Sequence, residues 1–138
     1  MANNDVVLNK VATIERCLIR INDEYHGHES ELETNYTRQD SIILNLQRAC
    51  EASIDIAMHL VRVRKLGIPQ ESRDAFDLLV DNDIISVHLS DRLKSMVGFR
   101  NVAVHDYRKL NLEIVRGVIE TRLDDFREFA ETALKLCS

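Results

Sequence analysis

Apolar residues recur at alternating steps of four and three along much of the sequence. This spacing places them on one face of an α-helix, which has about 3.6 residues per turn. Proline occurs once and glycine four times, so few positions can interrupt such helices. The first helix is expected from about Asp5 to Tyr25, and its apolar residues are Val7, Val11, Ile14, Leu18, Ile21 and Tyr25. These features predict an all-α protein.

A second helix is expected after the polar stretch of residues 26–36. Thr37, followed by Asp40 three residues later, resembles a capping box and predicts that the helix begins there. Gly67 and Pro69 mark its end. Two apolar rows about 100° apart predict that this helix contacts more than one partner helix. The rows are Ile42, Leu46, Ala49, Ser53, Ile56, Leu60 and Val63, and Ile43, Cys50, Ile54, Ala57 and Val61.

Further helix starts are predicted from residues that cap helices well. Ser72 can cap a short helix that continues to Val80, and Ser90 or Asp91 can cap a fourth helix. Asn111 is placed to cap the last helix, whose apolar residues again keep helical spacing. The expected architecture is an antiparallel four-helix bundle with one additional short helix.

Length and composition limit the class of protein. A chain of 138 residues with 45% hydrophobic content can form a sizeable core unaided, so we expect one helical domain over residues 1–138. The three cysteines are isolated and lack metal-ligand spacing, which predicts no metal site and no disulfide. No apolar run approaches the roughly 20 residues of a membrane span, and the N-terminus lacks a signal pattern. The expected location is the cytoplasm, away from membranes.

The charge of the chain is unevenly distributed. The net charge of -5 argues against a protein that coats nucleic acid by bulk electrostatics, and we expect no DNA partner. Between Ser90 and Leu110, five basic residues stand against two acidic ones, which gives this segment a local charge of +3. It is the predicted place for an anion.

The segment "GFRNVAVHDY", residues 98–107, places three chemically capable side chains in an apolar run. In a continued helix, Arg100 and Tyr107 fall on an apolar row with Leu93, Val97 and Val104. Burying an unpaired guanidinium is unfavourable, so Arg100 requires a carboxylate, a subunit interface or an anion. His105 lies about 140° away around the same helix. Either the helix breaks between the two, or two chains cooperate.

The alternative to a site is a structural role for these side chains. A histidine beside an apolar run is often a packing residue, and a tyrosine there can bury its ring while its hydroxyl finds a partner. A helix end just after His105 is favoured by Asp106, Lys109 and Asn111. Such an end would free the imidazole to turn.

Within this segment, "RNVAVHDY" has the pattern Arg-x4-His-x-Tyr and resembles the signature of the HEPN superfamily of small all-helical ribonucleases. It is similar in particular to HepT-like toxins, which are encoded beside a minimal nucleotidyltransferase antitoxin, MntA. Four further stretches also look similar to such toxins, so the resemblance covers most of residues 37–120. They are "QDSIILNLQRACEASIDIAMHL", "LGIPQESRDAF", "LSDRLKSMVGFRN" and "LNLEIV".

The resemblance implies a homodimer whose two motifs face each other across a cleft and form one RNA-cleaving site that needs neither metal nor cofactor. Arg100 would bind the scissile phosphate and stabilise charge in the transition state. His105 would act as general base on the ribose 2′-hydroxyl or as general acid to the leaving oxygen, giving a 2′,3′-cyclic phosphate. Tyr107 matches the tyrosine that the paired nucleotidyltransferase adenylylates, and the added charge and bulk would block RNA.

Asn101, Glu51 and Asp55 are candidate supporting residues. Glu51 and Asp55 share one side of the second helix and could pair with Arg100 or orient His105. Their alternative interpretation is a solvated strip of ion pairs. A second function also fits the fold, namely a non-catalytic helical dimer that presents substrate, or itself, to a nucleotidyltransferase. A purely structural helical protein is the third alternative.

Overall fold

The computed structural model describes residues 2–137, with side chains from Asn4 onward. These residues form six α-helices and two short 3₁₀ helices, and no strand occurs among them. The elements are α1 (Ala2–Tyr25), η1 (Glu29–Glu31), α2 (Tyr36–Val63), α3 (Ser72–Asp81), α4 (Val87–His105), η2 (Tyr107–Lys109), α5 (Leu112–Thr121) and α6 (Leu123–Leu136). The prediction of an all-α protein is confirmed.

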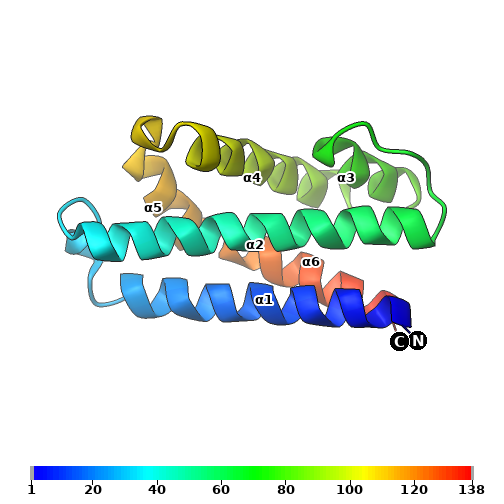
Figure 1. Ribbon diagram of the computed structural model, residues 1–138, viewed down its shortest axis with the longest axis horizontal. Coiled ribbons are helices and arrows are strands. Elements are labelled where there is room, and N and C mark those ends of the chain that lie inside the picture. The colour runs from blue at the N-terminus through cyan, green and yellow to red at the C-terminus, as the bar shows by residue number, and fades with distance from the viewer. Residues whose placement is uncertain (1, 138) are drawn as a thin grey trace.

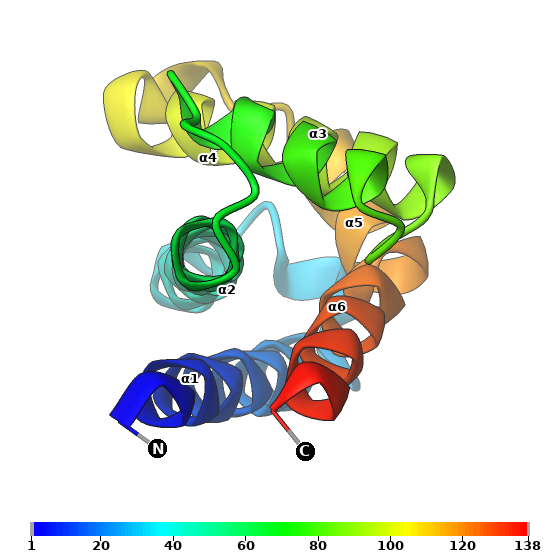
Figure 2. The ribbon, with the colours of Figure 1, turned by 90° about the vertical axis from the view of Figure 1, so that its right-hand side faces the viewer.

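The helices pack as an antiparallel four-helix bundle with one short helix added. Figure 1 shows α2 running antiparallel to both α1 and α4. The fourth member of the bundle consists of α5 and α6 in succession, and α6 packs against α1, α2 and α4. Figure 2 shows the bundle end on, with α2 lying between α1 on one side and α3 and α4 on the other. The predicted architecture is therefore confirmed.

The core lies where the bundle helices face one another. Both predicted apolar rows of α2 are buried, except for Val63, which is half-buried. Because the two rows together cover a wide face, α2 packs against α1, α3, α4 and α6. The prediction that this helix has more than one partner is confirmed. Phe129 of α6 also meets Phe76 of α3 edge to face, with ring centroids 5.7 Å apart.

The predicted start of α2 was wrong. The N-cap is Asn35, whose side-chain oxygen accepts a hydrogen bond from the Arg38 N–H at 3.1 Å. Thr37 lies in the first turn of the helix and is exposed. Both residue types are good N-caps, and the acidic residue three positions after Thr37 favoured the wrong one of the two.

The starts of the next two helices also differ from the prediction. Glu71, rather than Ser72, is the N-cap of α3, and it forms a reciprocal capping box with Asp74. Ser86, four residues before Ser90, caps α4 by accepting a hydrogen bond from the N–H three residues later at 3.0 Å. Apolar spacing marks the buried face of a helix, and it leaves the choice among neighbouring polar residues open.

The predicted last helix is divided into two. Asn111 caps α5 as predicted, because its side chain accepts a hydrogen bond from the Glu113 N–H at 2.8 Å. The helix then breaks at Arg122, and α6 begins at the following residue. The Thr121 hydroxyl donates to the carbonyl of Gly117 at 2.6 Å. This kind of bond back to the preceding turn bends helices, and glycine weakens them.

None of the helices within residues 2–137 combines the length and the apolar character that a membrane crossing requires.

Candidate functional site

The segment that carries Arg100 and His105 is one uninterrupted helix. Helix α4 extends from Val87 to His105 and then ends, with Asp106 as its C-cap. The predicted helix end just after His105 is confirmed. Because no break separates the two side chains, they project about 140° apart. A single chain therefore does not bring both side chains to the same atom of a substrate.

The apolar row predicted for α4 was correct in its first half and wrong in its second. Leu93 and Val97 are buried, but Val104 is 43% exposed, and the buried face turns instead to Ala103. Tyr107 has left the helix altogether and lies in η2. The row failed because α4 has almost no apolar bias toward one side, so spacing alone does not fix which residues face the core.

Arg100 is half-buried at the edge of that face. Its Nε atom is shielded from solvent and has no hydrogen-bond partner among the described residues. Its positive charge opposes the rise in the pKa of the Cys50 thiol that burial causes, which places the guanidinium near α2. No carboxylate within residues 4–137 lies within 4 Å of it. The sequence predicted that this charge would need a carboxylate, a subunit interface or an anion, and no carboxylate among the described residues pairs with it.

Arg100 and Asn101 open onto a small surface cavity of about 100 Å³ between α3 and α4. The cavity is lined by Glu71, Ser72, Arg73, Val97, Arg100 and Asn101. Asn101, which the sequence suggested as a supporting residue, is thus brought to Arg100. Arg73 was missed by the sequence, because it lies on another helix and no motif contains it.

His105 is exposed at the C-terminus of α4. Its imidazole is open to solvent and accessible to a substrate.

Tyr107 lies in η2 and is 40% exposed. Its hydroxyl donates a hydrogen bond to the Asp40 carboxylate near the start of α2. Burial of the ring, together with this bond and the negative charge of Asp40, raises the pKa of Tyr107. The sequence assigned Asp40 only to a capping box, and nothing in the pattern of residues joins positions 67 apart.

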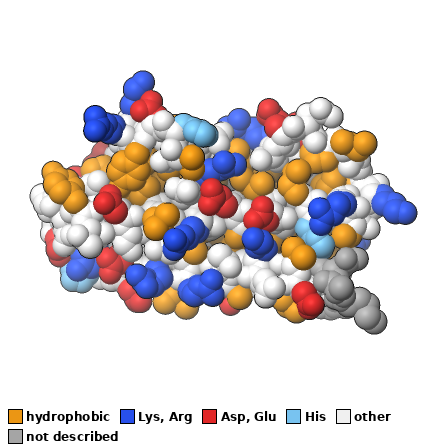
Figure 3. Space-filling view, viewed as in Figure 1, with side chains coloured by type: hydrophobic (Ala, Val, Ile, Leu, Met, Phe, Trp, Pro, Cys, Tyr) orange, Lys and Arg blue, Asp and Glu red, His pale blue; other side chains and the backbone are white. Residues whose placement is uncertain are grey.

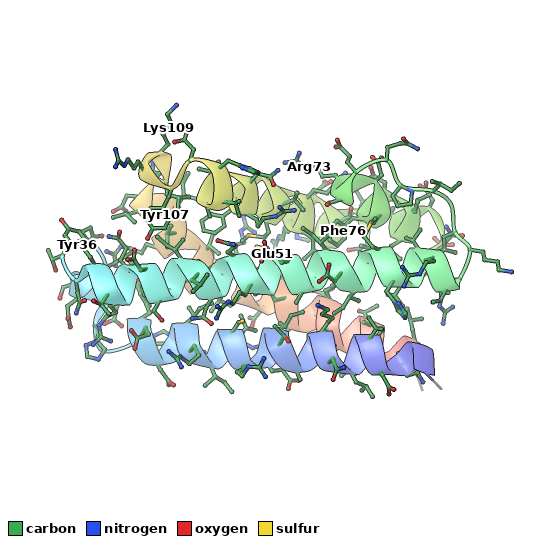
Figure 4. The ribbon with its side chains drawn as sticks, viewed as in Figure 1. Tyr36, Glu51, Arg73, Phe76, Tyr107 and Lys109 are labelled. Carbon is green, nitrogen blue, oxygen red and sulfur yellow. The ribbon has the colours of Figure 1, made fainter. Side chains whose placement is uncertain are left out.

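The two acidic supporting candidates on α2 have different surroundings. Asp55 forms an ion pair with Lys10 of α1, with Lys10 Nζ 2.9 Å from Asp55 Oδ2. It therefore faces α1 and does not join Arg100. Glu51 is half-buried on the side of α2 nearer α4, as Figure 4 shows, without an ion pair to any described residue. For Asp55, the alternative of a solvated ion pair is the one that the structure supports.

The histidines of the polar stretch bind neighbouring carboxylates. His28 Nδ1 lies 2.8 Å from Glu31 Oε2, and His26 Nδ1 lies 3.8 Å from Glu29 Oε2. In the described part of the chain, no three His, Cys, Asp or Glu side chains are grouped so that they could hold a metal ion.

Comparison with known proteins gives one consistent result. Residues 14–133 match the family described as Ribonuclease HepT-like. The chain is 56% identical over 128 residues to the mRNA nuclease HepT of Shewanella oneidensis, covering 93% of this chain and 96% of the relative.

Two solved structures are similar in fold and sequence. One is a tri-AMPylated Shewanella oneidensis HEPN toxin in complex with MNT antitoxin, with a TM-score of 0.88 and 55% identity over 93% of this chain and 96% of that chain. The other is a toxin–antitoxin with AMP-PNP, with a TM-score of 0.88 and 54% identity over the same shares. The chain belongs to the HepT-like ribonuclease family of HEPN proteins.

Proposed function

We propose that this chain is the ribonuclease toxin of a toxin–antitoxin pair, with Arg100 and His105 as its catalytic residues. The support is the 56% identity to an mRNA nuclease over nearly the full length of both chains, together with the Arg-x4-His-x-Tyr pattern. Arg100 adds a physical reason, because its half-buried guanidinium has no carboxylate partner among the described residues. A phosphate of RNA would supply the missing charge.

The proposed site is completed by a second copy of the chain. Arg100 and His105 project about 140° apart from one continuous helix, so a single chain presents them to different directions. A homodimer that apposes two α4 helices would let the motifs of both chains line one cleft. Val102 and Val104 are exposed apolar side chains within the motif, 38% and 43% accessible, and they suit such a contact. In Figure 3, hydrophobic side chains gather over α4 and its junction with α2.

The proposed reaction is an internal attack by the ribose 2′-hydroxyl on the adjacent phosphorus. A bond forms between the 2′-oxygen and phosphorus, the bond from phosphorus to the 5′-oxygen breaks, and a 2′,3′-cyclic phosphate results. Arg100 binds the phosphate oxygens and stabilises the charge that develops on them. His105 removes the proton from the 2′-hydroxyl or gives one to the leaving 5′-oxygen, since an imidazole can act as a base or as an acid.

Restraint of the toxin is proposed to come from a nucleotidyltransferase antitoxin that adenylylates Tyr107. The related Shewanella oneidensis toxin is AMPylated and is found in complex with an MNT antitoxin. Tyr107 is 40% exposed beside the motif, so its hydroxyl is within reach of another protein. In the proposed step, the Tyr107 oxygen bonds to the α-phosphorus of ATP, and pyrophosphate leaves. The added negative charge near Arg100 and His105 would repel RNA.

The cleavage test compares wild type with Arg100→Ala and His105→Ala on RNA in excess chelator. Arg20→Ala and His26→Ala serve as matched controls, because both residues are exposed and lie on α1 or directly after it, away from α4. We expect cyclic phosphate ends from wild type and both controls, and a loss of at least about 100-fold in the two motif variants. Equal cleavage by all five proteins would reject Arg100 and His105 as the catalytic residues, and no cleavage by wild type would leave the non-catalytic helical module as the function.

The modification test measures the intact mass of the chain after coexpression with the product of the neighbouring gene. The mass should rise by adenylyl units in wild type and remain unchanged in Tyr107→Phe. An unchanged wild-type mass would contradict the proposal.

The proposed dimer is tested by light scattering on the purified protein. The measured mass should be twice 15.9 kDa, and a monomer that still cleaves RNA would exclude the composite site.

A further inference from the structure

Arg73 of α3 lies against α4 at Gly98, a residue that has no side chain. A Cβ atom added at Gly98 would be 3.0 Å from Arg73 Nη2, which is tighter than an ordinary contact. Gly98 therefore makes the room in which the Arg73 guanidinium rests. Figure 4 shows Arg73 beside the middle of α4, on the same face of the molecule as Glu51 and Tyr107.

Arg73 and Arg100 line one cavity from two different helices, α3 and α4. The cavity of about 100 Å³ is lined by both arginines and by Val97 and Asn101 of α4. Around the helix, Val97 and Asn101 lie between Gly98 and Arg100, at about 100° per residue. With the Arg73 guanidinium over Gly98, the two cations thus flank a floor made by Val97 and Asn101. The cavity therefore lies between the guanidinium groups of Arg73 and Arg100, both of which are planar hydrogen-bond donors.

The positive charge of this cavity is not fully balanced by the described residues. Neither Arg73 nor Arg100 has an ion pair within 4 Å among them. Glu71 also lines the cavity, where its carboxylate caps α3 and offsets one of the two positive charges. The nearby Lys94 adds no unpaired charge, because its Nζ lies 2.7 Å from Asp77 Oδ1. Two guanidiniums that share a cavity repel each other unless an anion lies between them.

We propose that Arg73 binds the RNA phosphate next to the scissile one, so that Arg73 and Arg100 hold two neighbouring phosphates of one strand. This inference rests on the proposed ribonuclease function, and it adds a residue from outside the motif. Arg73 binds substrate but takes no part in the bond changes, because it is exposed and lies on a different helix from the reacting groups. A guanidinium suits this task, since its planar fork of donors matches phosphate oxygens.

The test compares a short oligoribonucleotide with a dinucleoside monophosphate, which has no neighbouring phosphate. For Arg73→Ala we expect the KM of the oligonucleotide to rise about tenfold with kcat unchanged, as for the loss of one charged hydrogen bond. The KM and kcat of the dinucleoside monophosphate should stay at wild-type values. Arg20→Ala, which removes an exposed arginine of α1, is the matched control and should change neither substrate.

Two further variants separate binding from loss of structure. Arg73→Lys keeps the charge and should recover part of the affinity, whereas Gly98→Ala displaces the guanidinium and should raise the KM of the oligonucleotide with the dinucleoside monophosphate unaffected. The salt dependence of binding gives a second measurement, made with His105→Ala so that the oligonucleotide is not cleaved. In a plot of log affinity against log salt concentration, the slope should be shallower by about 0.7 in the Arg73→Ala/His105→Ala double variant than in His105→Ala, because one phosphate contact is lost.

The outcomes distinguish this inference from the proposed function. If wild type cleaves RNA and Arg73→Ala matches Arg20→Ala in KM and in salt slope, Arg73 binds no phosphate and the inference is wrong. Equal losses on both substrates would also overturn it, because they would indicate a general defect. If wild type cleaves neither substrate, the proposed function fails by itself, and the salt slope still decides whether Arg73 contacts RNA.

Discussion

At the scale of single residues, Tyr107 depends on a partner that is distant in sequence. Its hydroxyl donates to Asp40 on α2, and this bond is the side-chain contact that ties η2 to that helix. The pKa of Tyr107 is raised by burial, by this bond and by the charge of Asp40. A phenol with a raised pKa stays protonated at neutral pH, so any modification of its oxygen must include removal of the proton.

Replacement of Asp40 by Asn should lower the pKa of Tyr107. The amide oxygen can still accept the hydrogen bond, but the negative charge is gone, while the effect of burial remains. The pKa should therefore fall and stay above the ordinary value of about 10. Alkaline titration followed by tyrosinate absorbance measures it, with Tyr107→Phe identifying the transition.

The same variant has a predicted effect on stability. A raised pKa in the folded state stabilises the fold at pH values below the ordinary pKa, and the contribution is lost as pH rises through the raised value. Asp40→Asn should thus be less stable than wild type at neutral pH, and the two should converge in strongly alkaline solution. A constant difference across this range in urea denaturation would contradict the assignment.

The residues of the site were predictable from sequence to the extent that one motif contains them. Arg100, His105 and Tyr107 share a segment with a recognisable pattern, and the place of Arg100 on an apolar row identified it as a charge in need of a partner. Asp40 and Arg73 lie on other helices, and their contacts with the motif exist only in the folded chain. The spacing of residues along a sequence does not show which helices will be in contact, which explains why Asp40 and Arg73 were missed.

At the scale of elements, faces were predicted better than ends. The two apolar rows of α2 are buried nearly in full, because burial of a wide apolar face is the main source of its stability. The N-caps of α2, α3 and α4 were each misplaced by one to five residues. A cap contributes roughly 1 kcal/mol, and several neighbouring polar residues compete for it, so tertiary packing decides among them.

The cap of α2 can be tested with a matched pair of substitutions. Asn35→Ala should lower the free energy of unfolding by about 1 kcal/mol, since it removes the acceptor for the Arg38 N–H. Thr37→Ala, at the residue that sequence favoured, should change it by less than about 0.5 kcal/mol. Urea denaturation followed by circular dichroism compares the two. The reverse order would restore Thr37 as the cap.

At the scale of the whole molecule, the short helix α3 is joined to the bundle through aromatic packing. Phe76 of α3 and Phe129 of α6 are both fully buried and meet edge to face. The chain between them passes through α4 and α5, so this contact closes a long loop of the fold. Because Arg73 also belongs to α3, the same packing positions the proposed second phosphate contact.

Phe129→Ala should destabilise the protein by about 3 to 5 kcal/mol, since it removes a buried ring and leaves a cavity. Ile19→Ala is the control, because Ile19 is 60% exposed on α1 and its loss should change stability by less than about 0.5 kcal/mol. Thermal and urea unfolding provide the comparison. A loss below about 1 kcal/mol for Phe129→Ala would show that the core closes around the missing ring.

The bond between Tyr107 and Asp40 has a consequence for the proposed modification. A tyrosine oxygen that carries a nucleotide has no hydrogen left to donate, and its phosphodiester would bring a second negative charge against the Asp40 carboxylate. The tether to α2 and the nucleotide therefore exclude each other. The hydrogen bonding of Asp40 would therefore change with modification. Its carboxylate accepts a hydrogen bond from Tyr107 in the unmodified chain and would lose that bond in the adenylylated chain.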